Sequence, residues 1–386
     1  MTRRYDLSRA GIMGATTSGT ARVSIMAVLI TVGFTTTLFL LAGANPIEAY
    51  LQYLVVPLTK QFTLLEVLVA STPILLTGAA VAIAFRAGFW NIGAEGQLLA
   101  GAVAAAAIGP LVGDLSPWLA IPLMIAGGAL AGAAWVLVPA LLRVRLGIDE
   151  VVTTLLLNPV ALLMVNALLH GPWRDPKTGF PESPRIAASA IYPDLIPKSR
   201  LHLGFVVALV IILVAWFVMT RTAAGLRMRA VGLSPHAARF AGMNVERTLL
   251  RVALVSGAIA GIAGVGEVAG IQHKLTSGLS SGFGYTGIVV AMLGGLTMPG
   301  VLLAGLLLGD LTVGASSASR ALNIPSEMGE VVQGVLLLVT VGLLAVRHGR
   351  VTRSDPPPDE AEVDLEPAGA GSGEPGPRAP VEPVPI

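Results

Sequence analysis

The chain has 386 residues, of which 54% are hydrophobic and only 12% charged, and its formal net charge is +2. So few charges cannot cover the surface of a water-soluble protein of this size, and such high hydrophobicity excludes a mostly disordered chain. The nearly balanced charge gives no indication of a nucleic-acid partner. The composition therefore predicts an all-α polytopic membrane protein of the cell membrane, in which 45 glycines allow close helix packing.

Apolar segments near the length of about 20 residues that a membrane helix needs recur along the chain. We expect ten spans, near 24–43, 64–85, 91–112, 119–142, 149–169, 203–220, 252–271, 285–297, 299–313 and 329–346. The eighth and ninth are short and meet at glycines and a proline. A single long broken helix, giving nine spans in total, is the alternative for these two.

The distribution of basic residues predicts the orientation of the chain, because cytoplasmic loops are enriched in lysine and arginine. Sixteen such residues fall on the side of the N-terminus and eight on the other side, so we expect both termini in the cytoplasm. Residues 1–23 are then a cytoplasmic segment and 24–346 the transmembrane domain. Within it, 171–202 is a proline-rich external loop, expected to pack as a small cap, and 221–251 is a cytoplasmic loop. The proline- and acid-rich tail, 347–386, is expected to be disordered.

Several motifs of soluble and metal-dependent enzymes are missing from the sequence. There is no phosphate-binding loop, no zinc-protease or serine-hydrolase motif, no cysteine, and no histidine pair with the spacing of metal ligands. We therefore expect no catalytic residue, no metal site and no cofactor. The chain is expected to be a pore or carrier that another subunit drives.

The most unusual local feature is the polar, glycine-interrupted stretch 86–97 at the start of the third span. Asn91, Glu95 and Gln97 lie there, and polar groups at this depth must face protein or a water-lined cavity. We interpret these three residues as lining the solute pathway. The alternative is a motif that only starts the helix, with Glu95 facing the positive end of the helix dipole.

Other polar residues fall inside or beside the spans. Asn158 precedes a proline that could kink the fifth span toward a cavity, and Glu267 lies among glycines of the seventh. For Glu267 a pathway role and a structural hydrogen bond are equally compatible with the sequence. Asp149 and Glu150 are expected to cap the fifth span and to form ion pairs with the nearby Arg143 and Arg145.

Glycines provide two further signals. Pairs spaced four residues apart predict close contacts between helices, and they are Gly128 and Gly132, Gly257 and Gly261, and Gly266 and Gly270. The stretch 280–287 is a second polar, glycine-rich start of a span. Two broken helices in the two halves of the chain suggest an inverted repeat with the solute site between them.

The cytoplasmic loop contains a short helix with clear end signals. Ser234 is a good N-cap, Pro235 suits the first helical position, and Gly242 stops a helix over 236–241. Such a stiff helix is well suited to docking into another protein. A basic loop that only contacts lipid headgroups is the alternative.

Together these features resemble the membrane permeases of ABC importers in the branched-chain amino acid, ribose and nucleoside permease superfamily, and most of all its nucleoside and simple-sugar branch. The similarity covers roughly residues 60–346. It is carried by four stretches in the family's order, namely 89–97 (FWNIGAEGQ), 149–158 (DEVVTTLLLN), 225–242 (GLRMRAVG…AARFAG) and 282–291 (GFGYTGIVVA).

The resemblance implies import of a small polar solute, delivered by an extracellular solute-binding lipoprotein and driven by ABC ATPase subunits, so that this chain itself is not an enzyme. It implies a permease dimer, preferably a heterodimer with a second permease and otherwise a homodimer. The loop 225–242 would carry the helix that couples to the ATPase, with roles for Arg229, Gly232, Ser234, Pro235, Ala238, Arg239 and Gly242. The resemblance also implies that Asn91, Glu95 and Gln97 lie near the solute pathway, to which the residues inside the spans add Asn158 and Glu267 as candidates.

The solute is expected to be a nucleoside first, a simple sugar second and a branched-chain amino acid third. A different class, a self-sufficient carrier coupled to protons or ions through Glu95 and Glu267, is the main alternative. A membrane scaffold that transports nothing is a further one.

Overall fold

A computed structural model describes residues 17–176, 178–325, 327–332, 334–335, 338–339 and 342. They belong to one compact unit that extends over residues 1–345. All regular elements in the described ranges are helices, which confirms the predicted all-α class. Residues 1–16, the tail 347–386 and half of the last predicted span lie outside the described residues.

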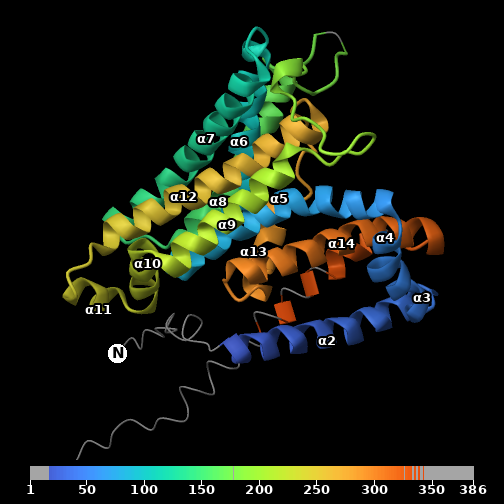
Figure 1. The fold of residues 1–386 in the computed structure, drawn as a ribbon, viewed down its shortest axis with the longest axis horizontal. Helices are drawn as coiled ribbons and strands as arrows, with labels where there is room; N and C mark the ends of the chain where they lie inside the picture. Colours follow the sequence, from blue (N-terminus) through green and yellow to red (C-terminus); the bar gives the residue numbers. More distant parts are fainter. Residues whose placement is uncertain are drawn as a thin grey trace, which may run out of the picture. The chain divides into compact units, whose positions relative to one another are not determined.

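Helices follow one another with short connections over most of the described chain (Figure 1). The α-helices are α2 (Thr17–Leu41), α3 (Pro46–Tyr50), α4 (Val56–Thr59), α5 (Gln61–Arg86), α6 (Ala94–Ile108), α7 (Pro117–Leu146), α8 (Glu150–His170), α9 (Leu203–Arg221), α10 (Ala223–Leu233), α11 (Pro235–Phe240), α12 (Val245–Gly266), α13 (Phe283–Leu293) and α14 (Met298–Leu322). A π-helical turn over Leu51–Val55 joins α3 to α4, and another over Glu267–Gln272 continues α12. Short 3-10 turns cover Gly109–Val112 and Ala188–Ala190.

Seven helices of the described ranges are long and apolar enough to cross a membrane. They are Gln61–Arg86, Ala94–Val112, Pro117–Leu146, Glu150–His170, Leu203–Arg221, Val245–Gln272 and Met298–Leu322, and they coincide with the second to seventh and the ninth predicted spans. Two shorter apolar helices, Val28–Leu41 and Phe283–Leu293, fall in the first and eighth.

The prediction for the ninth span was wrong in length. That span was expected to end near residue 313, but α14 continues to Leu322. It is also a separate helix from α13, because Gly295 and Leu296 both have positive φ angles, 61° and 55°, which no α-helix contains. The break falls between the glycines and the proline at which the two predicted spans meet.

The centre of the helix arrangement is α12, which packs against α5, α6 and α7, while α13 and α14 pack against α5. Two predicted glycine pairs lie where α12 crosses α7. A Cβ atom added to Gly257 would lie 2.5 Å from the carbonyl oxygen of Gly132, and one added to Gly261 would overlap the backbone of Gly128. The predicted close contacts between these helices are confirmed.

The third glycine pair does not bring two helices together, contrary to the prediction. Gly266 has no neighbouring atom within 4 Å of its Cβ position, and Gly270 lies against the imidazole ring of His202. That ring caps α9, because its Nδ1 accepts a hydrogen bond from the backbone N–H of Gly204 at 3.1 Å. Burial lowers the pKa of His202 to about 4, so the imidazole is neutral at pH 7.

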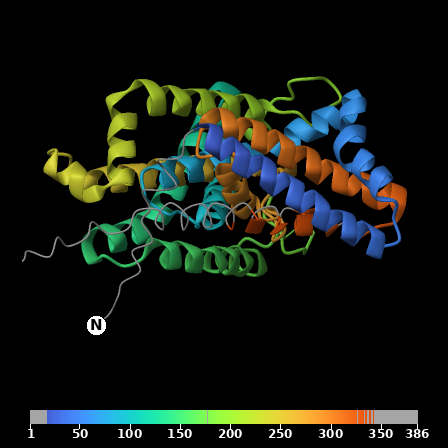
Figure 2. The ribbon, with the colours of Figure 1, turned by 90° about the horizontal axis from the view of Figure 1, so that it is seen from below.

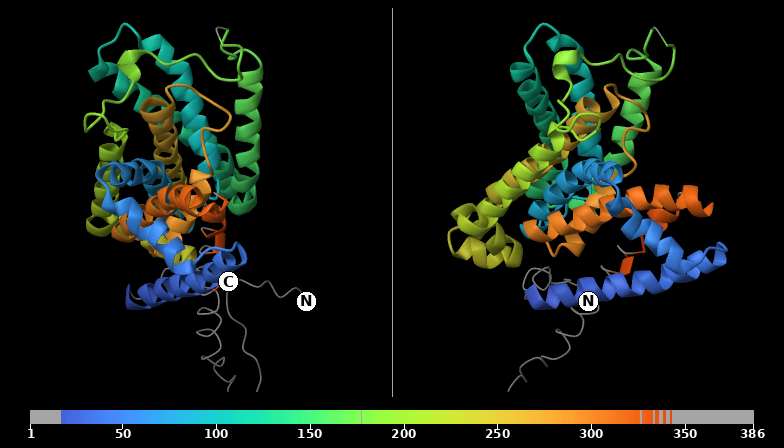
Figure 3. Two further views of the ribbon diagram at one scale, coloured as in Figure 1. Left: turned by 90° about the vertical axis from the view of Figure 1, so that its right-hand side faces the viewer. Right: turned by 45° about the vertical axis from the view of Figure 1, so that its right-hand side comes forward.

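The loop 171–202 packs onto the segment that follows α12 and its π-helical turn. Ser183 exchanges hydrogen bonds with Leu275, through N–H to carbonyl at 2.9 Å and through its hydroxyl to the Leu275 N–H at 2.8 Å. Glu182 forms an ion pair with Lys274 at 2.6 Å. Figures 1 and 3 show this loop and α11 at opposite ends of the helices.

Replacement of Gly261 by alanine is expected to destabilise the protein, because the added methyl group overlaps the α7 backbone at Gly128. We expect a loss of about 1–3 kcal/mol, typical of overpacking. The matched control is Gly266→Ala on the same helix, where the methyl group meets open space. It should leave stability unchanged or raise it by up to about 1 kcal/mol. Melting temperatures in detergent measure both, and equal values for the two variants would contradict the tight crossing.

Candidate functional site

The chain is not helical between the end of α5 at Arg86 and the start of α6 at Ala94. This broken stretch is buried, with Asn91 fully inaccessible to solvent. A buried backbone without helical hydrogen bonds must find other partners, since an unpaired N–H or C=O at this depth costs several kcal/mol. The partners come from α8, the last turn of α5 and the stretch itself.

Helix α8 presents a row of polar side chains to the broken stretch. Glu150 accepts a hydrogen bond from the backbone N–H of Trp90 at 3.2 Å, and the hydroxyl of Thr154 accepts one from Ile92 at 3.2 Å. These residues are four apart and therefore lie on one face of the helix. The predicted ion pair is also present, with Arg143 Nε 3.0 Å from Glu150 Oε2.

Asn158, four residues after Thr154, completes this row. Its Oδ1 accepts from the N–H of Gly96 at 2.9 Å, and its Nδ2 donates to the carbonyl of Ile92 at 2.9 Å. The same amide thus binds the first turn of α6 and the chain just before it. The proline that follows Asn158 does not interrupt α8, which runs unbroken to His170.

Asn91 and Gln97 bind each other. The Nδ2 of Asn91 donates to Gln97 Oε1 at 2.9 Å, and the Nε2 of Gln97 donates to Asn91 Oδ1 at 2.8 Å. Asn91 also donates to the hydroxyl of Ser256 on α12, which in turn donates to the carbonyl of Ala80 on α5 at 2.7 Å. In this state the two amides hold three helices together.

Glu95 points to the second broken helix. Its Oε2 accepts a hydrogen bond from the N–H of Gly284 at 2.7 Å, and the Ser280 side chain is a further partner. A Cβ atom on Gly284 would overlap the backbone of Glu95, so only glycine permits this contact. A carboxylate at the first turn of α13 also faces the positive end of that helix dipole. The two glycine-rich helix starts are therefore in direct contact.

Glu267 lies in a different place, on the π-helical turn that follows α12, and is 7% exposed. It lines a cavity of about 450 Å³ together with Glu66, Arg200, Phe283 and Arg320. Glu66 and Arg200 form an ion pair with two hydrogen bonds at this cavity.

The five predicted pathway residues thus form two groups. Asn91, Gln97 and Asn158 organise the broken start of α6, whereas Glu267 lines the cavity. Glu95 connects the groups, because the residue that it binds, Gly284, follows the cavity residue Phe283.

Sequence reasoning missed Arg200 and Arg320, which appeared only as charges in loop counts. Arg200 is 134 positions away from its partner Glu66. The only signal was that Glu66 is an acid inside a span, since such a group needs a partner.

The predicted short helix of the loop 221–251 is present as α11. The hydroxyl of Ser234 accepts a hydrogen bond from the N–H of Ala237 at 3.2 Å, Pro235 is its first residue, and Gly242 follows it with a φ angle of 78°. The preceding helix, α10, was not predicted. Figure 2 shows the chain turning at α10 and again at α11 before it enters α12.

The two faces of α11 differ sharply. Ala238 is only 3% exposed and packs with Val231 of α10 and Val245 of α12. Phe240 is 97% exposed at the end of the helix. Phe240 is thus the large apolar side chain that α11 leaves exposed.

A groove of about 660 Å³ lies beside α11. Gly232, Arg239 and the turn at Gly88 line it, and so does Arg143, the ion-pair partner of Glu150. The Arg143–Glu150 ion pair therefore connects the groove to the broken start of α6. The remaining predicted residue of this loop, Arg229, lies on α10 with its Nε buried and without a hydrogen-bond partner among the described residues.

The family model described as branched-chain amino acid transport system, permease component, matches residues 63–341. The chain belongs to this family. It is accordingly an integral membrane permease subunit, a transport component and not an enzyme, as the resemblance implied.

Individual relatives agree with this assignment. The permease is 38% identical over 279 residues to the guanosine ABC transporter permease protein NupP of Bacillus subtilis, covering 72% of this chain and 80% of NupP. It is 37% identical over 309 residues to the glucose ABC transporter permease protein TsgB13 of Haloferax volcanii, covering 78% and 81%. It is 31% identical over 331 residues to the nucleoside ABC transporter permease protein NupB of Lactococcus lactis, covering 82% and 90%. No solved structure matches the chain significantly.

Two substitutions of Glu95 separate its charge from its hydrogen bond. Glutamine keeps an oxygen acceptor for the Gly284 N–H, whereas alanine leaves that buried donor unpaired, at a cost of about 1–3 kcal/mol. We expect both variants to insert into the membrane and to lose solute uptake, but only the alanine variant to lose thermal stability.

Uptake assays in vesicles and melting temperatures in detergent check this prediction. If Glu95→Gln took up solute at the wild-type rate, the carboxylate charge of Glu95 would not be required for transport. An unchanged melting temperature for Glu95→Ala would show that α13 does not depend on this cap.

Proposed function

We propose that this permease imports nucleosides into the cell, with simple sugars as the second choice of solute, as part of an ABC importer. The relatives supply the strongest support, because their names specify guanosine, nucleosides and glucose. These solutes share neighbouring hydroxyl groups on a sugar ring, although their remaining chemistry differs.

The cavity at Glu267 has groups suited to such a ring. Carboxylate oxygens accept strong hydrogen bonds from hydroxyl groups, and Glu267 and Glu66 both line the cavity. The ring of Phe283 offers an apolar face for a base or a sugar. A branched-chain amino acid is the third choice, because its aliphatic side chain would gain little from these carboxylates.

In this proposal Glu95 and Glu267 approach the solute, while Asn91, Gln97 and Asn158 act on the pathway by holding the broken start of α6. A fixed but non-helical segment can change its arrangement more easily than a continuous helix. That property is useful to a carrier which exposes its site alternately to the two sides of the membrane.

We infer ten spans with both termini in the cytoplasm. The loop 171–202 then faces an extracellular solute-binding lipoprotein, and α11 faces the ATPase subunits. The location of this loop and α11 at opposite ends of the helices supports the arrangement (Figures 1 and 3). A second, related permease completes the pore as a heterodimer, with a homodimer as the alternative.

Coupling is proposed to start at α11. The exposed Phe240 would insert into an ATPase subunit, and the groove beside α11 would change as the ATPase closes. Arg143 lines that groove and pairs with Glu150, which holds Trp90 at the start of the broken stretch. Through these contacts a movement of α11 would shift the broken stretch that precedes Glu95.

The solute is tested by ATP-dependent uptake of labelled guanosine into vesicles that contain the permease with its ATPase subunits. Nucleosides are expected to compete at lower concentrations than ribose or glucose, and leucine should compete least. Stronger competition by leucine would contradict the nucleoside assignment. Concentrative uptake by the permease alone would identify a self-sufficient carrier.

The coupling role of α11 is best tested at Phe240. A charge at Ala238 would enter a buried cluster and unfold the helix, whereas Phe240→Asp changes only an exposed side chain. We expect Phe240→Asp to keep its melting temperature but to lose ATPase association and at least about tenfold of the uptake, as expected for an interface anchor.

The matched control is Phe180→Asp, the same substitution at an exposed phenylalanine of the 171–202 loop. It should leave ATPase association unchanged. Normal ATPase association by Phe240→Asp would contradict the docking of α11.

A further inference from the structure

A long apolar slot lies on the side of the helix arrangement, between α9 and α12. Its volume is about 420 Å³. Val210, Ile211 and Val214 of α9 face Val255, Ile259 and Ile262 of α12 across it. These two helices make few direct contacts, because α9 packs mainly on α5. The slot therefore separates two membrane helices along much of their length.

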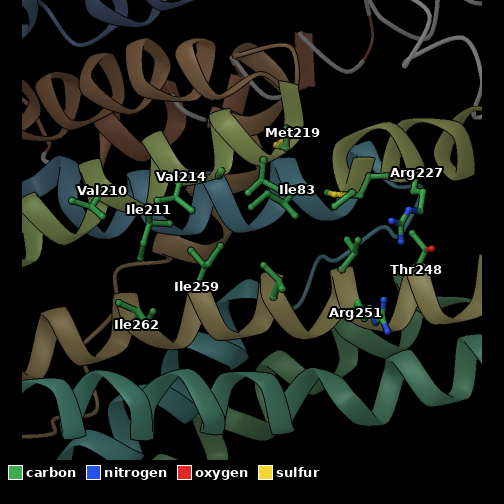
Figure 4. Close-up of a pocket in the computed structure, with 16 residues that line it drawn as sticks. Ile83, Val210, Ile211, Val214, Met219, Arg227, Thr248, Arg251, Ile259 and Ile262 are labelled. Carbon is green, nitrogen blue, oxygen red and sulfur yellow. The ribbon is translucent and has the colours of Figure 1, made fainter. Parts of the chain in front are cut away.

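One end of the slot is strongly basic. Arg227 of α10 and Arg251 of α12 line this end, with Thr248 between them (Figure 4). The hydroxyl of Thr248 already donates to the carbonyl of Asn244 at 2.9 Å. The donors that remain at this end are two guanidinium groups.

No acid among the described residues neutralises these two arginines. The nearest acid along α12, Glu246, is engaged by Arg239 at 3.6 Å. Two uncompensated guanidinium groups at the mouth of an apolar slot favour a ligand with a negative head and an apolar body. Arginine binds phosphate oxygens especially well, because its planar fork donates two parallel hydrogen bonds.

The length of the slot matches one leaflet of a bilayer. From Arg251 to Ile262 the helix advances by eleven residues, which is about 16 Å at 1.5 Å per residue. Half of a hydrocarbon core of about 30 Å is about 15 Å. A chain that starts at the arginines and follows the slot would thus end near the middle of the membrane.

We propose that the slot binds one anionic phospholipid, with its phosphate between Arg227 and Arg251 and an acyl chain between α9 and α12. The imported solute is excluded as the occupant, because a hydroxyl-rich molecule would leave its polar groups unpaired against the aliphatic lining. A second permease helix is a poorer fit, because an apolar helix would leave both arginines without a partner. Anionic lipids are also enriched in the cytoplasmic leaflet, where the basic loop is expected.

The lipid would support the segment that carries α11. Helix α10 follows α9 directly and leads into α11, and α12 follows α11. A lipid that fills the slot would fix α9 and α10 against α12. Its binding does not depend on which solute is transported, so the site can be tested without a transport assay.

The test uses the full-length permease in a neutral detergent and measures bound lipid by native mass spectrometry and melting temperature during titration with phosphatidylglycerol. Phosphatidylcholine is the neutral comparison lipid. We expect the wild-type protein to retain one phosphatidylglycerol and to melt at a higher temperature with it, with a weaker response to phosphatidylcholine.

Two kinds of variant examine the two ends of the slot. The double variant Arg227→Gln and Arg251→Gln is expected to weaken phosphatidylglycerol binding by roughly tenfold or more. Val214→Trp should weaken it as well while keeping both charges, because the indole fills the slot. The matched control is Arg247→Gln, which removes an exposed charge one turn before Arg251, outside the slot.

Three results would overturn the proposal. Wild-type phosphatidylglycerol binding by the double variant is the first, and equal loss of binding by Arg247→Gln is the second. The third concerns the oligomeric state of the double variant and of Val214→Trp. If either variant changed from dimer to monomer while it retained lipid as the wild type does, the slot would be a contact between permease copies.

Discussion

The structure of this permease depends on one requirement, which is that a non-helical stretch of backbone inside the membrane must have all its polar groups satisfied by protein. The stretch between α5 and α6 meets it through a row of side chains on α8. Glu150, Thr154 and Asn158 are each four residues apart, and each accepts a hydrogen bond from a backbone N–H in or just after the stretch. This explains physically why the motifs at 89–97 and 149–158 occur together in one chain.

Small residues make this arrangement possible. In lipid there is no hydrophobic driving force between apolar helices, so contact depends on close packing and interhelical hydrogen bonds. Gly257 and Gly261 bring α12 against α7, and the same helix then presents Ser256 to Asn91 and Glu267 to the cavity. The packing glycines, Ser256 and Glu267 therefore lie on α12 and its π-helical continuation.

The five predicted pathway residues are of two kinds, amides and carboxylates. The side chains of Asn91 and Gln97 form two hydrogen bonds with each other, and the side chain of Asn158 forms two with the backbone. These amides therefore have structural partners in this state. In the proposed function, the carboxylates of Glu95 and Glu267 are the groups that approach the solute. The groove beside α11 is connected to the same region through the ion pair of Arg143 with Glu150, and in the proposed function this connection links an ATPase subunit to the site.

The sequence by itself determined the features that depend on residue type and spacing within a short segment. Seven of the ten predicted apolar segments, the capping of α11 by Ser234, the ion pair of Glu150 and the crossing at Gly261 follow from length, residue type and spacing, and the described part of the structure contains them. The spacing of four between Glu150, Thr154 and Asn158 places them on one face of a helix, but it does not indicate which segment they bind.

Only the tertiary structure decided which distant groups meet. It paired Arg200 with Glu66 across 134 positions, turned Ala238 inward and Phe240 outward, and placed His202 against Gly270 in what had the pattern of a helix-packing motif. The physical reason is that such contacts depend on how separate helices are oriented. That orientation results from the packing of the whole domain, which no short window of residues encodes.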